Sequence, residues 1–261
     1  MQPKIFVHAL PGLVEPEELT VGTVVVIDVL RATTSIVHAF AAGAKAVYPC
    51  AEVAEAEQIA EELRKSRPGE PVLLAGERNC LAIDGFDLGN SPAEFSDAQV
   101  ANAWIIFTTT NGTSAFKRCR EAERVLVGAF VNASAVFRQL AEESAIVHLL
   151  CAGTDGEYGR DDTLLAGYFV DRLERAGGLR YELNAQALTA RENWRAAFAE
   201  PYALGAEPIP QALLAEELGK STAARKLVAA RLEKDILDAA AFDRFDCVPR
   251  YRRETGWITR T

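Results

Sequence analysis

Six short apolar segments constrain this 261-residue chain more than any other feature. Each ends in a turn or leads directly into residues with helical periodicity. The segments are VVVI (24–27), KAVYPC (45–50), PVLLA (71–75), WIIFT (104–108), RVLVG (124–128) and AIVHLLC (145–151). Apolar runs of this length, rich in Val, Ile and Leu and separated by helices, are typical of parallel strands that are buried on both faces. The pattern predicts an α/β fold with three αβα layers and a mostly parallel sheet.

The pattern changes after about residue 178, where Ala-, Leu- and Glu-rich segments predict a helical C-terminal part. One continuous helix is expected over residues 222–242, with Ser221 or Thr222 as its cap. We expect a single unit over residues 1–261. Two subdomains with a boundary near residue 130 are the weaker alternative, because the same strand–turn–helix pattern occurs on both sides of that point.

Charge and composition exclude several classes of function. The net charge is −9, from 28 basic and 37 acidic residues, which argues against binding to nucleic acid or to an anionic membrane. No segment approaches the roughly 18 apolar residues of a membrane span, and the N-terminal residues lack a signal-peptide pattern. The five cysteines form no CxxC pair, which favours a reducing cytoplasm. We therefore expect a cytoplasmic protein.

Polar residues gather in the turns that follow the predicted strands. In an open parallel sheet, the carboxyl ends of the strands meet at one edge, where ligands bind. Asp28, Glu77, Asn111 and the acidic group near Asp162 are therefore expected to lie together despite their separation in the sequence.

The turn DVLRATTS (28–35) combines a helix start with hydroxyl groups. Free backbone N–H groups at a helix start favour an anion, and Arg31 could add a bidentate contact to it. Thr33 belongs to the same candidate site. The alternative is purely structural: a threonine caps the helix, and Asp28 pairs with Arg31.

Three further turns carry candidate binding residues, each with a structural alternative. In TTTNGTSAF (108–116), Gly112 permits close backbone approach beside Asn111 and Thr113, although Asn-Gly is also a common plain turn. The long segment 76–92 contains Glu77, Arg78, Asn90 and Ser91, and loops of this length are often functional rather than merely solvated. In 152–167, the acids near Arg160 and Asp162 suit Mg²⁺, or form only an acidic first helical turn.

Several familiar site patterns are absent from the sequence. There is no GxxxxGK[ST] loop, no GxGxxG after a strand and no GxSxG elbow. Leu30 stands two residues after Asp28, where an aspartyl-phosphate phosphatase would have a second acid. His8, His38 and His148 form no close pair in the sequence, so core positions are favoured over a zinc or iron site.

Taken together, the turns resemble those of the 2-phosphosulfolactate phosphatase family. The similar motifs are DVLRATTS (28–35), GE (76–77), GFDLGNSP (85–92), TNGT (110–113) and GRDDTLLAG (159–167), and they occur in the family's order. The resemblance implies a Mg²⁺-dependent phosphatase that converts (2R)-2-phospho-3-sulfolactate to 3-sulfolactate and phosphate. It also implies a homodimer. The family's motif residues fall on Asp28, Arg31, Thr33, Glu77, Asn90, Ser91, Asn111, Gly112, Thr113 and Asp162.

On this hypothesis the substrate is a small anionic phosphate ester. Asp28, Glu77 and Asp162 would be ligands of Mg²⁺, directly or through water. Arg31 and the TNGT turn would hold the phosphoryl oxygens, with Asn90 and Ser91 completing the wall. From charge alone, Arg78 or Arg160 would bind the sulfonate or the carboxylate.

Alternatives are left open at two levels. Either Asp28 attacks phosphorus and forms an acyl phosphate, or a metal-bound water attacks. The substrate could instead be another phosphorylated hydroxy acid, or the chain could be a non-catalytic module that binds a phosphorylated metabolite.

Overall fold

Strands from all parts of the chain form one sheet in the computed structural model, which describes residues 2–143, 145–176, 180–203 and 209–260. Their order across the sheet is β5-β4-β6-β3-β11-β10-β7-β2-β8-β1-β9. The strands are β1 (Lys4–His8), β2 (Thr23–Ile27), β3 (Ala46–Cys50), β4 (Val72–Arg78), β5 (Leu81–Ala82), β6 (Trp104–Thr108), β7 (Arg124–Gly128), β8 (Ile146–Cys151), β9 (Glu182–Leu183), β10 (Arg250–Arg252) and β11 (Trp257–Thr259). Apart from β5, β10 and β11, neighbouring strands pair in parallel. The predicted mostly parallel α/β sheet is therefore confirmed.

A C-terminal hairpin joins two groups of parallel strands. β10 pairs with β7 and β11 pairs with β3, both antiparallel, so the hairpin lies between β4-β6-β3 and β7-β2-β8-β1. This hairpin is not predicted from the sequence. Each of its strands has three residues, which is too short for a recognisable alternation of apolar and polar residues.

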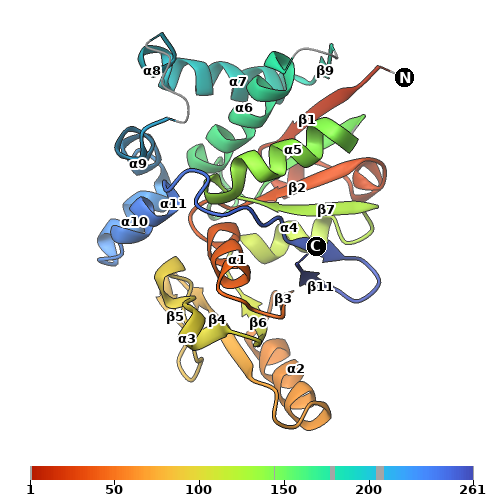
Figure 1. Ribbon diagram of the computed structural model, residues 1–261, viewed down its shortest axis with the longest axis vertical. Coiled ribbons are helices and arrows are strands. Elements are labelled where there is room, and N and C mark those ends of the chain that lie inside the picture. The colour runs from red at the N-terminus through yellow and green to blue at the C-terminus, as the bar shows by residue number, and fades with distance from the viewer. Residues whose placement is uncertain (1, 144, 177–179, 204–208, 261) are drawn as a thin grey trace.

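Helices cover both faces of the sheet (Figure 1). They are α1 (Ala32–Ala41), α2 (Val53–Ser66), α3 (Asp97–Val100), α4 (Gly112–Arg118), α5 (Ala133–Glu143), α6 (Arg160–Arg175), α7 (Ala185–Ala197), α8 (Ala199–Ala203), α9 (Gln211–Gly219), α10 (Thr222–Ala229) and α11 (Lys234–Ala239), with short 3₁₀ turns η1 (Pro11–Leu13), η2 (Pro16–Leu19), η3 (Pro92–Glu94) and η4 (Phe130–Asn132). Val25 and Ile27 of β2 belong to the core beneath α5, α6 and α7, whereas Val24 and Val26 belong to the core beneath α1 and α4. Because successive residues of a strand point to opposite faces, this division gives three layers.

The C-terminal part is helical, but the single helix predicted over residues 222–242 is wrong. The structure divides it into α10 and α11. Between them Arg231 has φ of +62°, the Leu232 amide donates to the Leu227 carbonyl at 2.8 Å, and the Arg231 amide donates to the Val228 carbonyl at 3.0 Å. These two bonds form a Schellman ending, which redirects the chain. The predicted cap is confirmed at Ser221, whose hydroxyl accepts the Ala224 amide at 3.0 Å.

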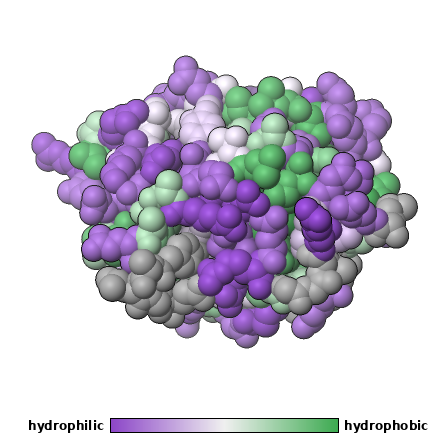
Figure 2. Space-filling view, turned by 90° about the horizontal axis from the view of Figure 1, so that it is seen from above, coloured by the Kyte–Doolittle hydropathy of each residue, from purple (hydrophilic) through white to green (hydrophobic). Residues whose placement is uncertain are grey.

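Hydrophilic residues predominate on the face of the molecule that is drawn in Figure 2. Figure 2 shows one face of the molecule, on which apolar side chains form patches among polar and charged ones. Among the described helices, none combines the length and the apolar character needed to cross a lipid bilayer.

Candidate active site

A cavity opens where the turns after four strands meet α10. The cavity and its mouth, with the open solvent between their walls included, enclose about 480 Å³. Its lining residues are Asp28, Leu30, Arg31, Glu77, Asn79, Cys80, Asn90, Thr109, Thr110, Asn111, Thr154, Asp155, Ala223, Lys226 and Leu227. The turns after β2, β4, β6 and β8 thus contribute to one site, as the topology of a parallel sheet requires.

The turn after β2 fixes Asp28 at the edge of this cavity. The Ala32 amide donates a hydrogen bond to Asp28 Oδ1 at 3.2 Å. Asp28 is only 5% exposed, and none of the described residues donates a hydrogen bond to its Oδ2. One carboxylate oxygen is therefore held by the start of α1, and the other is available to a ligand.

Hydroxyl groups in this turn hold the backbone rather than line the cavity. Thr33, Thr34 and Ser35 are fully buried. Their hydroxyls donate, at 2.7–2.8 Å, to the carbonyl oxygens of Asp28, Val29 and Asn90, respectively. Thr33, a predicted substrate contact, thus lies behind the cavity wall. Neither structural alternative for this turn is found: α1 has no side-chain cap, and Arg31 pairs with Asp235 instead of Asp28.

Buried carboxylates crowd around Asp28. Burial, together with the charges of Asp161 and Glu77, raises the pKa of Asp28 to about 7, although the Ala32 amide and Arg31 oppose this shift. Burial also raises the pKa of Asp161 to about 6. Burial, with the charges of Asp161 and Asp28, raises the pKa of Asp162 well above its usual range. Like charges held this closely favour either a shared proton or a bound cation.

Two of these acids tie separate turns together through backbone amides. Asp162 accepts the Val29 amide at 2.8 Å on one oxygen and the Gly153 amide at 2.9 Å on the other. Glu77 does the same with the amides of Thr110 at 2.9 Å and Cys80 at 2.8 Å. Asp162 therefore joins the turns after β2 and β8, and Glu77 joins those after β4 and β6.

The TNGT turn approaches Asp28 closely because residue 112 is glycine. A Cβ at Gly112 would lie 2.7 Å from Asp28 Oδ2 and 2.7 Å from the Ala32 Cβ. Asn111 lines the cavity and accepts the Asp155 amide on its Oδ1 at 3.0 Å. Thr113 donates its hydroxyl to the Thr109 carbonyl at 2.9 Å, so it stabilises the turn.

Arg31 is held deep in the wall by α11. Its guanidinium binds Asp235 at 2.8 Å and the Cys80 carbonyl at 3.0 Å. Asp235 also accepts the hydroxyl of Ser91. Arg31, Ser91 and Asp235 therefore form one polar group, and the neighbouring Asn90 has a buried Oδ1 without a hydrogen-bond partner among the described residues.

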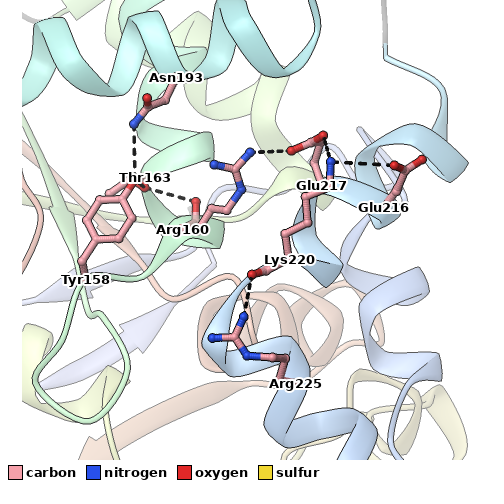
Figure 3. Close-up of polar contacts among 8 residues, drawn as sticks. All are labelled: Tyr158, Arg160, Thr163, Asn193, Glu216, Glu217, Lys220 and Arg225. Atoms are coloured by element: carbon pink, nitrogen blue, oxygen red, sulfur yellow. Dashed lines mark hydrogen bonds and ion pairs between the residues drawn. The ribbon is translucent and has the colours of Figure 1, made fainter.

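The structure places the other two predicted arginines outside the lining. Arg78 donates to the carbonyls of Glu77 at 2.8 Å and Ala51 at 2.6 Å, so it stabilises the end of β4. Arg160 binds Glu217 of α9, which also binds Lys220 (Figure 3). Neither guanidinium is directed to the cavity by these contacts.

Comparison with known proteins places the chain in a family. A family model described as 2-phosphosulpholactate phosphatase matches residues 9–254. The chain belongs to the 2-phosphosulfolactate phosphatase family. A Thermotoga petrophila protein named probable 2-phosphosulfolactate phosphatase is 39% identical over 228 residues, covering 87% of this chain and 88% of the relative.

Two further relatives carry the same name. The Symbiobacterium thermophilum protein is 43% identical over 180 residues, covering 69% of this chain and 75% of the relative. The Caldanaerobacter subterraneus protein is 45% identical over 161 residues, covering 62% of this chain and 65% of the relative.

The side chains around Asp28 offer carboxylate and amide oxygens, which are the ligand atoms that Mg²⁺ prefers. Mg²⁺ takes oxygen ligands, and proteins usually hold it through one or two carboxylates together with waters and substrate phosphate. Asp161 Oδ1 and Asn90 Oδ1 are buried oxygens with no hydrogen-bond partner in the described chain. No three His, Cys, Asp or Glu side chains of that part of the chain are arranged to hold a metal by themselves. The fit is to an ion that shares its ligands with water and substrate.

Sequence reasoning missed several lining or supporting residues of this family member. Cys80 and Asn79 lie in a tight turn with φ of +68° and +53°, a conformation that the sequence Asn-Cys does not signal. Lys226 and Asp235 lie on α10 and α11, where a charged residue is ordinarily a solvated one. Only the path of the C-terminal helices brings them to the cavity.

Proposed function

We propose that the chain is a Mg²⁺-dependent phosphatase that hydrolyses (2R)-2-phospho-3-sulfolactate to 3-sulfolactate and phosphate. Family membership supports the substrate class. The observation that carries the proposal is Asp28: a buried carboxylate at the cavity wall, crowded by other acids, with one oxygen that accepts no hydrogen bond from the described residues.

Asp28 and Glu77 are the proposed metal-holding residues, because both are carboxylates that line the cavity. When bound, Mg²⁺ supplies positive charge that neutralises the phosphate and the charge developing during transfer. Asp162 has a supporting part in this proposal, because it does not line the cavity and its two oxygens tie the turns after β2 and β8 together. Arg31 adds a fixed positive charge to the same wall.

Two chemical routes share this arrangement. In the first, an Asp28 oxygen attacks phosphorus, the bond from phosphorus to the ester oxygen breaks, and water hydrolyses the resulting acyl phosphate. In the second, Asp28 accepts a proton from a water molecule that attacks phosphorus. In both routes the ester oxygen leaves with the electron pair of the broken bond and takes up a proton, from water in the first route and from Asp28 in the second, to become the hydroxyl of 3-sulfolactate. Acid quenching within one turnover of a ³²P-labelled substrate separates them, because only the first route leaves label on the protein.

Phosphate release from 2-phospho-3-sulfolactate tests the proposal. The assay compares Mg²⁺ with EDTA, and compares this substrate with 2-phospholactate and 2-phosphoglycerate. Mg²⁺-dependent release that is fastest with the sulfonated ester is expected. Equal release from all three esters would remove the substrate assignment, and saturable binding without release from any would favour a non-catalytic binding module.

Two remaining expectations belong to the same proposal. The protein is proposed to be a homodimer, which light scattering after size exclusion tests through its molar mass. A cytoplasmic location is proposed from the five cysteines, which are all unpaired in the structure. Cell fractionation with a tagged copy tests it.

A further inference from the structure

The proposed substrate carries more negative charge than the floor of the cavity can neutralise. It has a phosphate, a carboxylate and a sulfonate, whereas the described lining contains three acidic side chains, Asp28, Glu77 and Asp155, and two cationic ones, Arg31 and Lys226. Binding of the carboxylate or the sulfonate therefore requires that one of these two cations can leave its protein carboxylate and bind the substrate instead.

Arg31 is committed to the protein. Its side chain is 3% exposed and its partner Asp235 is 2% exposed, at 2.8 Å. Separating a buried pair leaves an uncompensated charge and is strongly unfavourable. Arg31 can therefore contribute a fixed positive charge to the wall, but it is not expected to leave Asp235 in order to bind a ligand.

Lys226 has the opposite character. Its side chain is 40% exposed, and it forms an ion pair with Asp155, whose side chain is 52% exposed. Exposed ion pairs contribute little to stability because water and salt screen both charges. The ammonium group can therefore exchange Asp155 for an anionic group of the substrate at small cost.

The positions of these residues also distinguish the two ends of a ligand. Asp28 is 5% exposed at the floor, whereas Lys226 lies on α10 with a solvent-exposed side chain and lines the same cavity. In 2-phospho-3-sulfolactate the sulfur is one bond further from phosphorus than the carboxyl carbon is. With phosphate at Asp28, the sulfonate is the group that extends furthest toward Lys226.

We propose that Lys226 binds the sulfonate of the substrate and so determines specificity for a sulfonated phosphate ester. The inference rests on the proposed function. An ammonium group suits this role, because it binds a tetrahedral anion as a point charge without requiring bidentate geometry. It also replaces the sequence-based assignment of this role to Arg78 or Arg160, which bind protein groups elsewhere.

Kinetics with three phosphate esters tests the proposal. 2-Phospho-3-sulfolactate has both other anions, 2-phospholactate lacks the sulfonate, and O-phosphoisethionate keeps the sulfonate but lacks the carboxylate. In Lys226→Gln we expect kcat/KM to fall about 10- to 100-fold for the two sulfonated esters, the effect of losing one charged hydrogen bond. For 2-phospholactate we expect less than a 2-fold change.

Lys220→Gln is the matched control, because Lys220 is also an exposed, ion-paired lysine near α10 and does not line the cavity. It should leave all three values of kcat/KM unchanged. An equal loss for 2-phospholactate in Lys226→Gln would assign Lys226 to phosphate or carboxylate, and no loss for any ester would give it no part in binding; either overturns the proposal. If the unsubstituted protein hydrolyses none of the esters, the proposed function itself fails. That outcome is seen without the variants, so it is distinguishable from failure of the Lys226 proposal.

Discussion

The floor of the cavity consists of the turns after the strands, with Asp28, Glu77 and Asp162, and the C-terminal wall consists of α10 and α11. The two parts are held in place in different ways. At the floor, Glu77 and Asp162 each accept two backbone amides from turns that follow different strands. At the wall, α10 and α11 reach the site through side-chain pairs, Lys226 with Asp155 and Asp235 with Arg31. Hydrogen bonds to backbone amides hold the carboxylates of the floor in one position. The ion pairs of the wall differ from one another, because the buried pair is strong and the exposed pair can exchange its partner. This difference supports the proposed division, in which the chemistry occurs at the floor and the substrate is selected at the wall.

Removing the charge of Asp28 should have the largest effect on activity. Asp28→Asn is expected to lower kcat by at least about 10³-fold, as loss of a nucleophile or general base does. The fold should persist, because the amide keeps the Oδ1 position that accepts the Ala32 amide. Phosphate-release kinetics and circular dichroism measure the two effects. Activity within 10-fold of the unsubstituted protein would remove Asp28 from the chemistry and with it the distinct role of the floor.

Breaking the buried pair of the wall should mainly affect stability. Asp235→Ala leaves Arg31 buried without its partner, and we expect a loss of about 3–5 kcal/mol in the free energy of unfolding. Urea unfolding measures it. Glu233→Ala, an exposed acid at the start of α11, is the control and should change stability by less than about 0.5 kcal/mol. Equal effects of the two variants on the free energy of unfolding would show that the Arg31–Asp235 pair does not stabilise the wall.

Gly112 tests how precisely the floor must be placed. In Gly112→Ala the new Cβ would overlap Asp28 Oδ2, so the carboxylate or the TNGT turn must shift. A displacement of about 1 Å near the reacting atoms costs about 10²-fold in rate, and we expect that loss in kcat. Gly219→Ala, at a position with open space around the added carbon, should have no effect. An unchanged kcat in Gly112→Ala would mean that the floor tolerates movement.

The acids of the floor should also make stability depend on pH. Because the pKa values of Asp28 and Asp161 in the folded protein are about 7 and about 6, above their usual 3.8, the folded state binds more protons than the unfolded state. The contribution of these acids to stability in EDTA should therefore fall as pH rises from about 4 to 7, by at most about 1.4 kcal/mol per pH unit for each group. Burial lowers the pKa values of His8, His38 and His148, so these three histidines act in the opposite direction below pH 6.5.

The difference between the unsubstituted protein and Asp28→Asn isolates the acid contribution, because both contain the same histidines. Urea unfolding at pH 5, 6, 7 and 8 should show a smaller decline for Asp28→Asn. Added Mg²⁺ should stabilise the unsubstituted protein more at pH 8 than at pH 5, since the ion replaces a proton. Parallel pH curves for the two proteins would contradict the crowding of acids around Asp28.

The sequence predicts the floor better than the wall. Strands such as VVVI (24–27) are recognisable from composition, and the rule that parallel strands end at one edge brings Asp28, Glu77 and Asn111 together. The same rule does not state where a long side chain goes, which is why Arg78 and Arg160 were expected at the substrate although each binds a protein group.

The wall depends on contacts between distant segments. Lys226 and Asp235 look like ordinary charges of amphipathic helices. The path of α10 places Lys226 in the cavity lining, and after the turn at Arg231 α11 places Asp235 against Arg31. The hairpin of β10 and β11 is also not predictable from the sequence, because its short strands are stabilised by pairing with β7 and β3. Such features follow from tertiary contacts rather than local propensity.

A crystal structure of Asp28→Asn with Mg²⁺ and 2-phospho-3-sulfolactate tests the central claim most directly. This variant should retain the substrate unhydrolysed. The account predicts phosphorus beside residue 28 at the floor and the sulfonate sulfur beside Lys226, displaced from Asp155. Substrate bound in another part of the molecule, or bound in this cavity with its phosphate against Lys226, would contradict the division between a reacting floor and a selecting wall.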